Sequence, residues 1–126
     1  MKQFWLGIFL LLLFLGLGLW VTKAMEDTHS AVSEALTLAA EQAMAGDLES
    51  GVQTAEQARG KWQAGWHGTA AVADHAPMDE IDSLFAQMQV YAQAGEAVDF
   101  AAYCRRLSAL VHAVGEAHGF SWWNLL

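Results

Sequence analysis

The stretch from Phe4 to Val21 reads FWLGIFLLLLFLGLGLWV and carries no charged or strongly polar side chain. As an α-helix its 18 residues would span about 27 Å at about 1.5 Å per residue, close to the roughly 30 Å hydrocarbon core of a bilayer. Indole rings favour the headgroup boundary, and a tryptophan lies at each end. The stretch therefore predicts one transmembrane helix, with lipid-facing anchor residues that include Phe4, Trp5, Leu10, Leu13 and Trp20.

A cleaved signal peptide is the alternative interpretation of this apolar run. Signal peptides usually have an apolar core of about 7–15 residues followed by a small-residue cleavage site. The run here is longer, and Lys23 sits inside the possible cleavage sequence formed by Thr22, Lys23 and Ala24. We therefore predict an uncleaved anchor in residues 1–25 and a separate domain in residues 26–126.

The flanking charges predict the orientation in the membrane. The N-terminal amine and Lys2 precede the run, whereas Lys23 on the other side is offset by Glu26 and Asp27. Basic residues are enriched on the cytoplasmic side of membrane helices. We expect a single-pass protein of the cell membrane, with its N-terminus in the cytoplasm and its domain outside.

The region after the anchor is strongly acidic. All 14 acidic residues lie there, against four basic ones beyond Lys23, which gives a formal charge of about −10. Such a surface repels nucleic acid, so we expect no nucleic-acid partner. The only cysteine, Cys104, falls on an apolar helix face and is predicted to be a buried thiol.

Apolar residues after the anchor recur at spacings of three and four, which is the helical pattern. We expect helices over about 28–45, 48–66, 77–95 and 97–117, the first of which could continue directly from the anchor. Gly46-Asp47 and Gly95 are typical of a left-handed helix end, and Pro77 suits a first helical turn. Short connections favour antiparallel neighbours, so the predicted fold is all-α: a transmembrane helix and a small antiparallel bundle of about four helices arranged as two helical hairpins.

The segment Asp74-His75-Ala76-Pro77-Met78-Asp79-Glu80-Ile81-Asp82 resembles a bacterial membrane-anchored family, domain of unknown function 4363. Members of this family have a membrane helix, acidic helices, a tryptophan, an Asp-His step and an ending close to Asn-Ile-Leu. In this chain Trp62 or Trp66 resembles the tryptophan, Asp74-His75 the Asp-His step, and Asn124-Leu125-Leu126 the ending. The resemblance implies the architecture and topology given above. It implies no activity, because none is established for the family.

The densest polar cluster is Asp74, His75, Asp79 and Asp82. Carboxylate and imidazole groups near a helix start could hold a divalent metal or act as acid and base. The simpler interpretation is that they cap the helix and complement its dipole. His112 and Glu116 lie one turn apart but lack the His-Glu-x-x-His spacing of zinc proteases. We therefore predict no catalytic residue, no metal site and no cofactor.

The aromatic residues are numerous for so small a domain. We expect Trp62 and Trp66, one turn apart, to lie in the core. Trp122, Trp123, Leu125 and Leu126 are predicted to dock near them after a turn at Gly119, and contact with the membrane interface or a partner is the alternative.

These features predict a non-enzymatic, membrane-tethered accessory domain that binds another membrane or envelope protein. A structural, self-associating membrane protein is the alternative, and a metal-binding or enzymatic domain is less favoured.

Overall fold

The computed structural model is all-helical over the residues that it describes, with no strand in 1–69 or 75–123. Its four helices are α1 (Lys2–Met44), α2 (Leu48–Thr69), α3 (His75–Ala94) and α4 (Ala97–Trp123). Residues 70–74 and 124–126 lie outside the description, as do the side chains at 22, 25, 26, 66–69, 75–77 and 117–123. The predicted all-α class is thus confirmed for the described chain.

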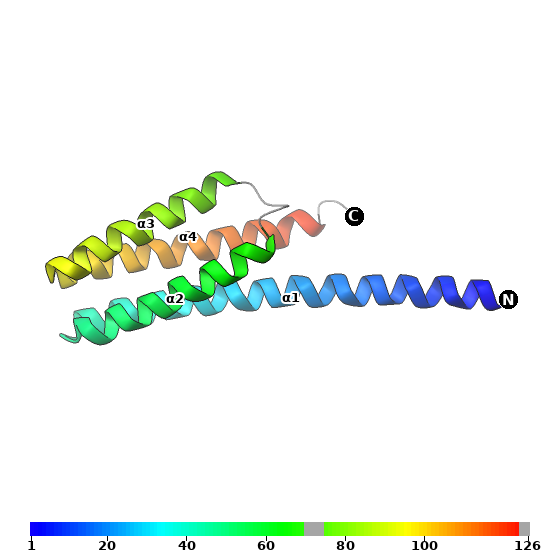
Figure 1. Ribbon diagram of the computed structural model, residues 1–126, viewed down its shortest axis with the longest axis horizontal. Coiled ribbons are helices and arrows are strands. Elements are labelled where there is room, and N and C mark those ends of the chain that lie inside the picture. The colour runs from blue at the N-terminus through cyan, green and yellow to red at the C-terminus, as the bar shows by residue number, and fades with distance from the viewer. Residues whose placement is uncertain (70–74, 124–126) are drawn as a thin grey trace.

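The longest helix, α1, joins the apolar run to the rest of the molecule without a break (Figure 1). Residues Lys2–Val21 are long and apolar enough to cross a membrane, and none of this window is buried by the protein itself. A signal sequence near an N-terminus can also be long and apolar enough to meet this description. The proposed domain boundary at residue 25 falls inside this continuous helix, and packing against other helices begins near Thr28.

Two tight turns connect the helices in pairs. Gly46 and Gly95 have φ angles of 90° and 74°, the left-handed conformation that glycine adopts without steric cost, as predicted. The Asp47 carboxylate accepts a hydrogen bond from the Ser50 N–H at 3.1 Å and another from the Ser50 hydroxyl at 2.7 Å. The side-chain bond first, and then the backbone bond, lower the pKa of Asp47 below its ordinary value. Asp47 therefore caps α2 as a carboxylate.

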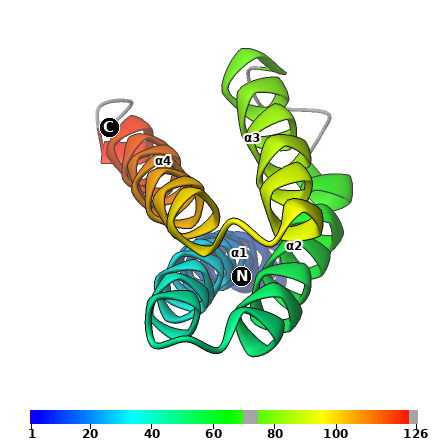
Figure 2. The same ribbon diagram turned by 90° about the vertical axis from the view of Figure 1, so that its left-hand side faces the viewer.

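The second half of α1 lies at the centre of the helix packing. It contacts both α2 and α4, α3 packs mainly on α4, and α2 and α3 touch only slightly. The end-on view shows the result, with α1 below and between its neighbours and the upper parts of α3 and α4 diverging (Figure 2). The first half of α1 extends beyond the other three helices (Figure 1).

The core follows the predicted apolar faces. Large side chains with less than 2% exposure come from α1, α3 and α4, whereas α2 contributes mainly alanines and Trp62. Cys104 is fully buried, as predicted, and burial raises the pKa of its thiol to about 12. The buried apolar residues that recur at spacings of three and four are Val32, Leu36, Ala39, Ala40, Ala43, Ala55, Ala58, Trp62, Ile81, Leu84, Phe85, Met88, Phe100, Cys104, Leu107, Val111 and Val114.

Small residues let α1 and α2 approach closely. A Cβ atom on Gly51 would lie 2.8 Å from the backbone oxygen of Ala39 and 3.3 Å from the backbone nitrogen of Ala43. Real Cβ atoms do not approach backbone atoms so closely, so the contact requires glycine at this position of α2.

Three helix ends differ from the expected ones. α2 continues to Thr69 and α3 begins at His75. α4 passes through Gly119 and ends at Trp123, so the predicted helix end near Ala117 was wrong. One glycine inside a helix costs only about 1 kcal/mol relative to alanine, too little to end a helix on its own.

Candidate functional site

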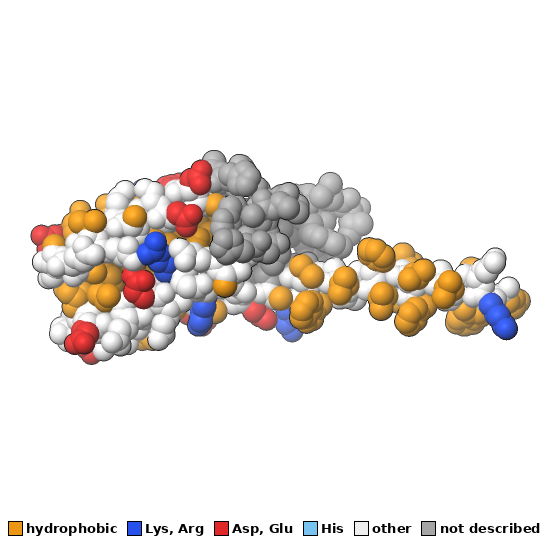
Figure 3. Space-filling view, viewed as in Figure 1, with side chains coloured by type: hydrophobic (Ala, Val, Ile, Leu, Met, Phe, Trp, Pro, Cys, Tyr) orange, Lys and Arg blue, Asp and Glu red, His pale blue; other side chains and the backbone are white. Residues whose placement is uncertain are grey.

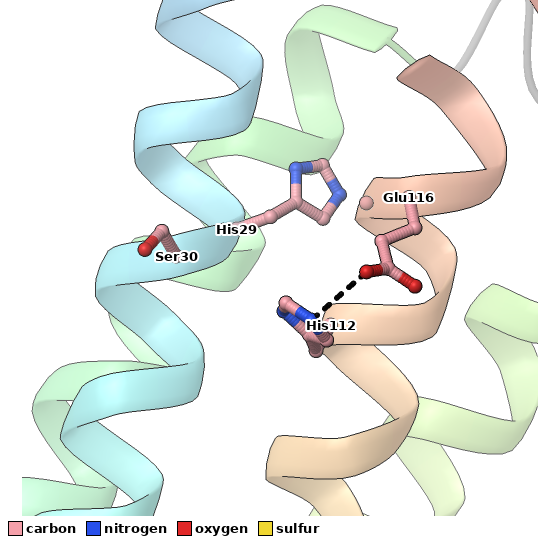
Figure 4. Close-up of a pocket in the computed structure, with 5 residues that line it drawn as sticks. His29, Ser30, His112 and Glu116 are labelled. Carbon is pink, nitrogen blue, oxygen red and sulfur yellow. Dashed lines mark ion pairs between the residues drawn. The ribbon is translucent and has the colours of Figure 1, made fainter. Parts of the chain in front are cut away.

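A small open pocket lies where α1 and α4 meet, on the part of the bundle nearest the apolar run. It is lined by His29, Ser30, His112, Gly115 and Glu116 and has a volume of about 200 Å³. In the close-up, His29 projects from α1 toward α4, while His112 and Glu116 extend from successive turns of α4 (Figure 4). The pocket therefore brings together two imidazoles and one carboxylate from two helices.

Close packing positions the His29 ring. A Cβ atom on Gly115 would lie 3.1 Å from Cβ of His29, so a larger residue at position 115 would press on the His29 side chain and require a shift of a few tenths of an ångström. The ring also meets Trp62 of α2 edge to face, with centroids 5.7 Å apart and planes at 84°. Such aromatic contacts contribute about 0.5–1.5 kcal/mol beyond their buried area. His29 thus links α1, α2 and α4 at one level of the bundle.

The other two ionisable groups of the pocket face solvent. His112 Nε2 lies 3.2 Å from Glu116 Oε1, with the two side chains 65% and 69% exposed. An exposed pair one helical turn apart contributes little to stability. The hydroxyl of Ser30 points away from both imidazoles (Figure 4). Within the described residues, no group of three or more His, Cys, Asp and Glu side chains could hold a metal ion.

A line of hydroxyl groups holds α1 to α4 beside this pocket. The Ser108 hydroxyl donates to the Ser33 backbone oxygen at 2.9 Å, and it lies 2.8 Å from the Ser33 hydroxyl and 2.9 Å from the Thr37 hydroxyl. Ser108 is the one buried polar side chain among the described residues, with 8% exposure. Buried hydroxyl groups must be hydrogen-bonded, so this network fixes the position of α4 along α1.

The polar cluster predicted from the sequence is only partly described. Asp79 and Asp82 are exposed on α3, and neither takes part in a described ion pair. His75 is the first residue of α3, with its side chain outside the description, and Asp74 lies outside the described residues. The prediction that this polar cluster lies at a helix start agrees with the bounds of α3, which begins at His75. The hypothesis that the cluster binds a metal stays a hypothesis.

Of the predicted tryptophan pair, Trp62 is buried, with 4% exposure. The side chains of Trp66, Trp122 and Trp123 lie outside the description, as do Leu125 and Leu126 entirely. Docking of the tail near Trp62 therefore remains a prediction.

Sequence reasoning missed the residues that join α1 to α4. Ser33 and Thr37 are one turn apart and follow the core residues Val32 and Leu36, and Ser108 follows Leu107. A pattern of small polar residues beside an apolar stripe is typical of closely packed helices, so this signal was present in the sequence.

The surface divides into two parts of different chemistry. Apolar side chains cover much of the visible face of the first half of α1, and acidic and basic side chains are scattered over the visible face of the bundle (Figure 3). Among the described residues, an ion pair between Arg106 of α4 and Glu80 of α3, at 3.8 Å, joins two helices.

The chain was compared with family models, with curated proteins and with solved structures, and no match was found in any of the three.

Proposed function

We propose that the chain is a membrane-tethered, non-enzymatic accessory domain that binds another membrane or envelope protein. In this proposal residues 4–21 span the cell membrane, the N-terminus is cytoplasmic, and two helical hairpins form an antiparallel bundle outside. The proposed similarity to domain of unknown function 4363 is consistent with this layout.

One observation supports the proposal most: α1 is both the exposed apolar helix and the central helix of the bundle. A free helix exposing large apolar residues on every side would aggregate in water, whereas a bilayer covers them. Because the helix is continuous, the tether and the packed domain form one element. An acidic domain held in this way is suited to presenting a surface at a fixed distance from the bilayer.

The surface that we propose for the partner is at the end of the bundle remote from the apolar run. Four large apolar side chains are exposed close to the two turns there: Leu38 at 47%, Met44 at 55%, Val90 at 64% and Val98 at 68%. They are the exposed large apolar residues described outside the anchor, and we call them the distal apolar set. Exposed apolar patches on a folded domain often mark surfaces that contact another protein.

Site-specific photocrosslinking in native membranes tests this function. A photoreactive residue at Val90 or Val98 should give one discrete heterologous adduct, whereas the same residue at the exposed Gln57 of α2 should give none. Adducts only between copies of this chain would instead support the structural, self-associating alternative. Equal diffuse labelling at all three positions would contradict a specific partner surface.

The non-enzymatic part of the proposal has its own test. His75→Ala should leave the metal content of the purified full chain at background and lower stability only modestly, since residues at a helix start contribute on the order of 1 kcal/mol. Stoichiometric zinc or iron that is lost in this variant would contradict it.

A further inference from the structure

One side of α1 is not covered by any other helix of the described chain. Within the bundle α1 packs on α2 through one side and on α4 through another. In the end-on view its remaining side is turned away from both neighbours (Figure 2). Because α1 is one continuous helix, this outer face runs without a break from the apolar run to the end of the bundle.

An apolar lane runs along the outer face at a spacing of seven residues, which is close to two helical turns. Within the bundle, Leu38 and Ala24 are exposed and Ala31 is half-buried. The same spacing continues into the apolar run at two exposed leucines. We call these five residues the outer lane: Leu10, Leu17, Ala24, Ala31 and Leu38. An apolar repeat of seven is typical of a helix that packs lengthwise against another helix.

A row of carboxylates accompanies the outer lane outside the apolar run. Asp27, Glu34 and Glu41, the acidic row, are exposed and also lie seven residues apart, or about 10 Å along the helix. Each follows a residue of the outer lane by three positions, as the charged residues that flank the apolar seam of paired helices do. None of the three takes part in an ion pair among the described residues. The same positions inside the apolar run are Leu13 and Trp20, so the face changes from apolar to acidic where the apolar run ends.

The acidic row distinguishes between two kinds of occupant for this face. Copies of a single-pass chain cross the membrane in the same direction, so a second copy packed here would bring its own acidic row to the same heights. Like charges that face each other destabilise a contact between helices. Lys23 is the only lysine or arginine of α1 beyond the apolar run, so α1 itself supplies little compensating charge. The face therefore favours a different chain with basic side chains at these heights.

We propose that the outer face binds a helix of another membrane protein, which spans the bilayer beside α1 and continues outside it with lysine or arginine at about every seventh residue. The proposal rests on the proposed tether and partner function, and it names the chemistry of the partner. The outer lane packs against the partner helix, and the acidic row pairs with its basic side chains. Leu38 belongs to both the outer lane and the distal apolar set, so one partner covers both surfaces.

Energy transfer in phosphatidylcholine vesicles tests the proposal with a defined probe. The full chain carries a donor dye at the position of Gln57, which is exposed on α2. The probe is an acceptor-labelled peptide with an apolar segment of about 20 residues followed by a helix with lysine at every seventh position. A matched peptide has glutamate in place of each lysine. The lysine peptide should bind the chain about tenfold more tightly, because three exposed charge pairs change from repulsive to attractive.

Charge reversal on the chain supplies the matched control. Glu34→Lys/Glu41→Lys should invert the preference, so that this variant binds the glutamate peptide more tightly than the lysine peptide. Glu49→Lys/Asp82→Lys makes the same change in net charge at exposed positions of α2 and α3, and it should keep the original preference. Binding of the glutamate peptide also shows that the first variant is folded.

Three results would overturn the proposal. They are equal binding of the two peptides by the unmodified chain, an unchanged preference in Glu34→Lys/Glu41→Lys, and stronger transfer between copies of the chain than to either peptide. The third result would place a second copy on the outer face.

Photocrosslinking in native membranes separates this proposal from the partner function. Discrete heterologous adducts at Val90 and Val98 that persist in Glu34→Lys/Glu41→Lys would contradict only the binding of the partner to the outer face. The absence of any heterologous adduct at either position in the unmodified chain would contradict the partner function itself.

Discussion

The contact between α1 and α2 allows a sharp test, because two of the glycines in α2, Gly51 and Gly60, lie in opposite surroundings. Gly51 is buried, and a Cβ atom there would lie 2.8 Å from a backbone oxygen that cannot rotate away. Gly60 is exposed, and a Cβ atom there would meet nothing within 4 Å. Gly51→Ala and Gly60→Ala are thus the same chemical change on one helix, with and without a steric clash.

The expected difference follows from two opposing effects. Both substitutions gain about 1 kcal/mol of helix propensity. Only Gly51→Ala forces α2 away from α1, and overpacking of this kind costs about 1–3 kcal/mol. We therefore expect Gly60→Ala to be the more stable variant by about 1–3 kcal/mol, or several degrees in melting temperature for a domain of about 100 residues.

Urea unfolding of the full chain in detergent micelles, followed by far-ultraviolet circular dichroism and by tryptophan fluorescence, measures this difference. The membrane helix is common to both variants, so its signal cancels in the comparison. Equal unfolding midpoints for Gly51→Ala and Gly60→Ala would refute the close packing of α2 on α1.

Three further predictions concern hydroxyl, carboxylate and thiol groups. Ser108→Ala should lower the free energy of unfolding by about 1 kcal/mol, because the hydroxyls of Ser33 and Thr37 lose a shared partner; an unchanged urea midpoint would contradict this. The pKa of Asp47 is lowered in the folded state, so its stabilising effect is present above its ordinary value of 3.8 and is lost as the pH falls through the folded value. Asp47→Asn should therefore weaken the acid dependence of stability between pH 7 and pH 3 (about the titration range of a carboxyl group), as acid-unfolding curves would show. The Cys104 thiol, with a pKa of about 12, should react with maleimide only after unfolding, and rapid labelling of the native protein would contradict its burial.

The helices and most of the core could be predicted from the sequence, because apolar spacing of three and four dictates which face of a helix is buried. The two turns at Gly46 and Gly95 could also be predicted, because the left-handed backbone conformation at a helix end strongly favours glycine. Helix ends without such a residue were less predictable. Gly119 lies inside α4, and a single glycine costs a helix only about 1 kcal/mol, which is too little to predict a helix end.

The pocket could not be predicted from the sequence, because it is formed by contacts between residues that are far apart along the chain. His29 and Gly115 are distant in sequence, and their contact depends on the register between α1 and α4. That register is set by hydrogen bonds of Ser108, whose partners could be anywhere along an apolar helix face. Side-chain spacing within one helix predicts a face but not the height at which a second helix packs on it.

The proposed tether requires that α1 stays intact as one helix from the apolar run into the bundle. The most direct measurement is the intact mass and N-terminal sequence of the protein recovered from carbonate-washed membranes. We predict that the recovered chain begins ahead of Phe4 and remains in the membrane pellet. A mature chain that begins near Met25, or that is released by the carbonate wash, would contradict the claim.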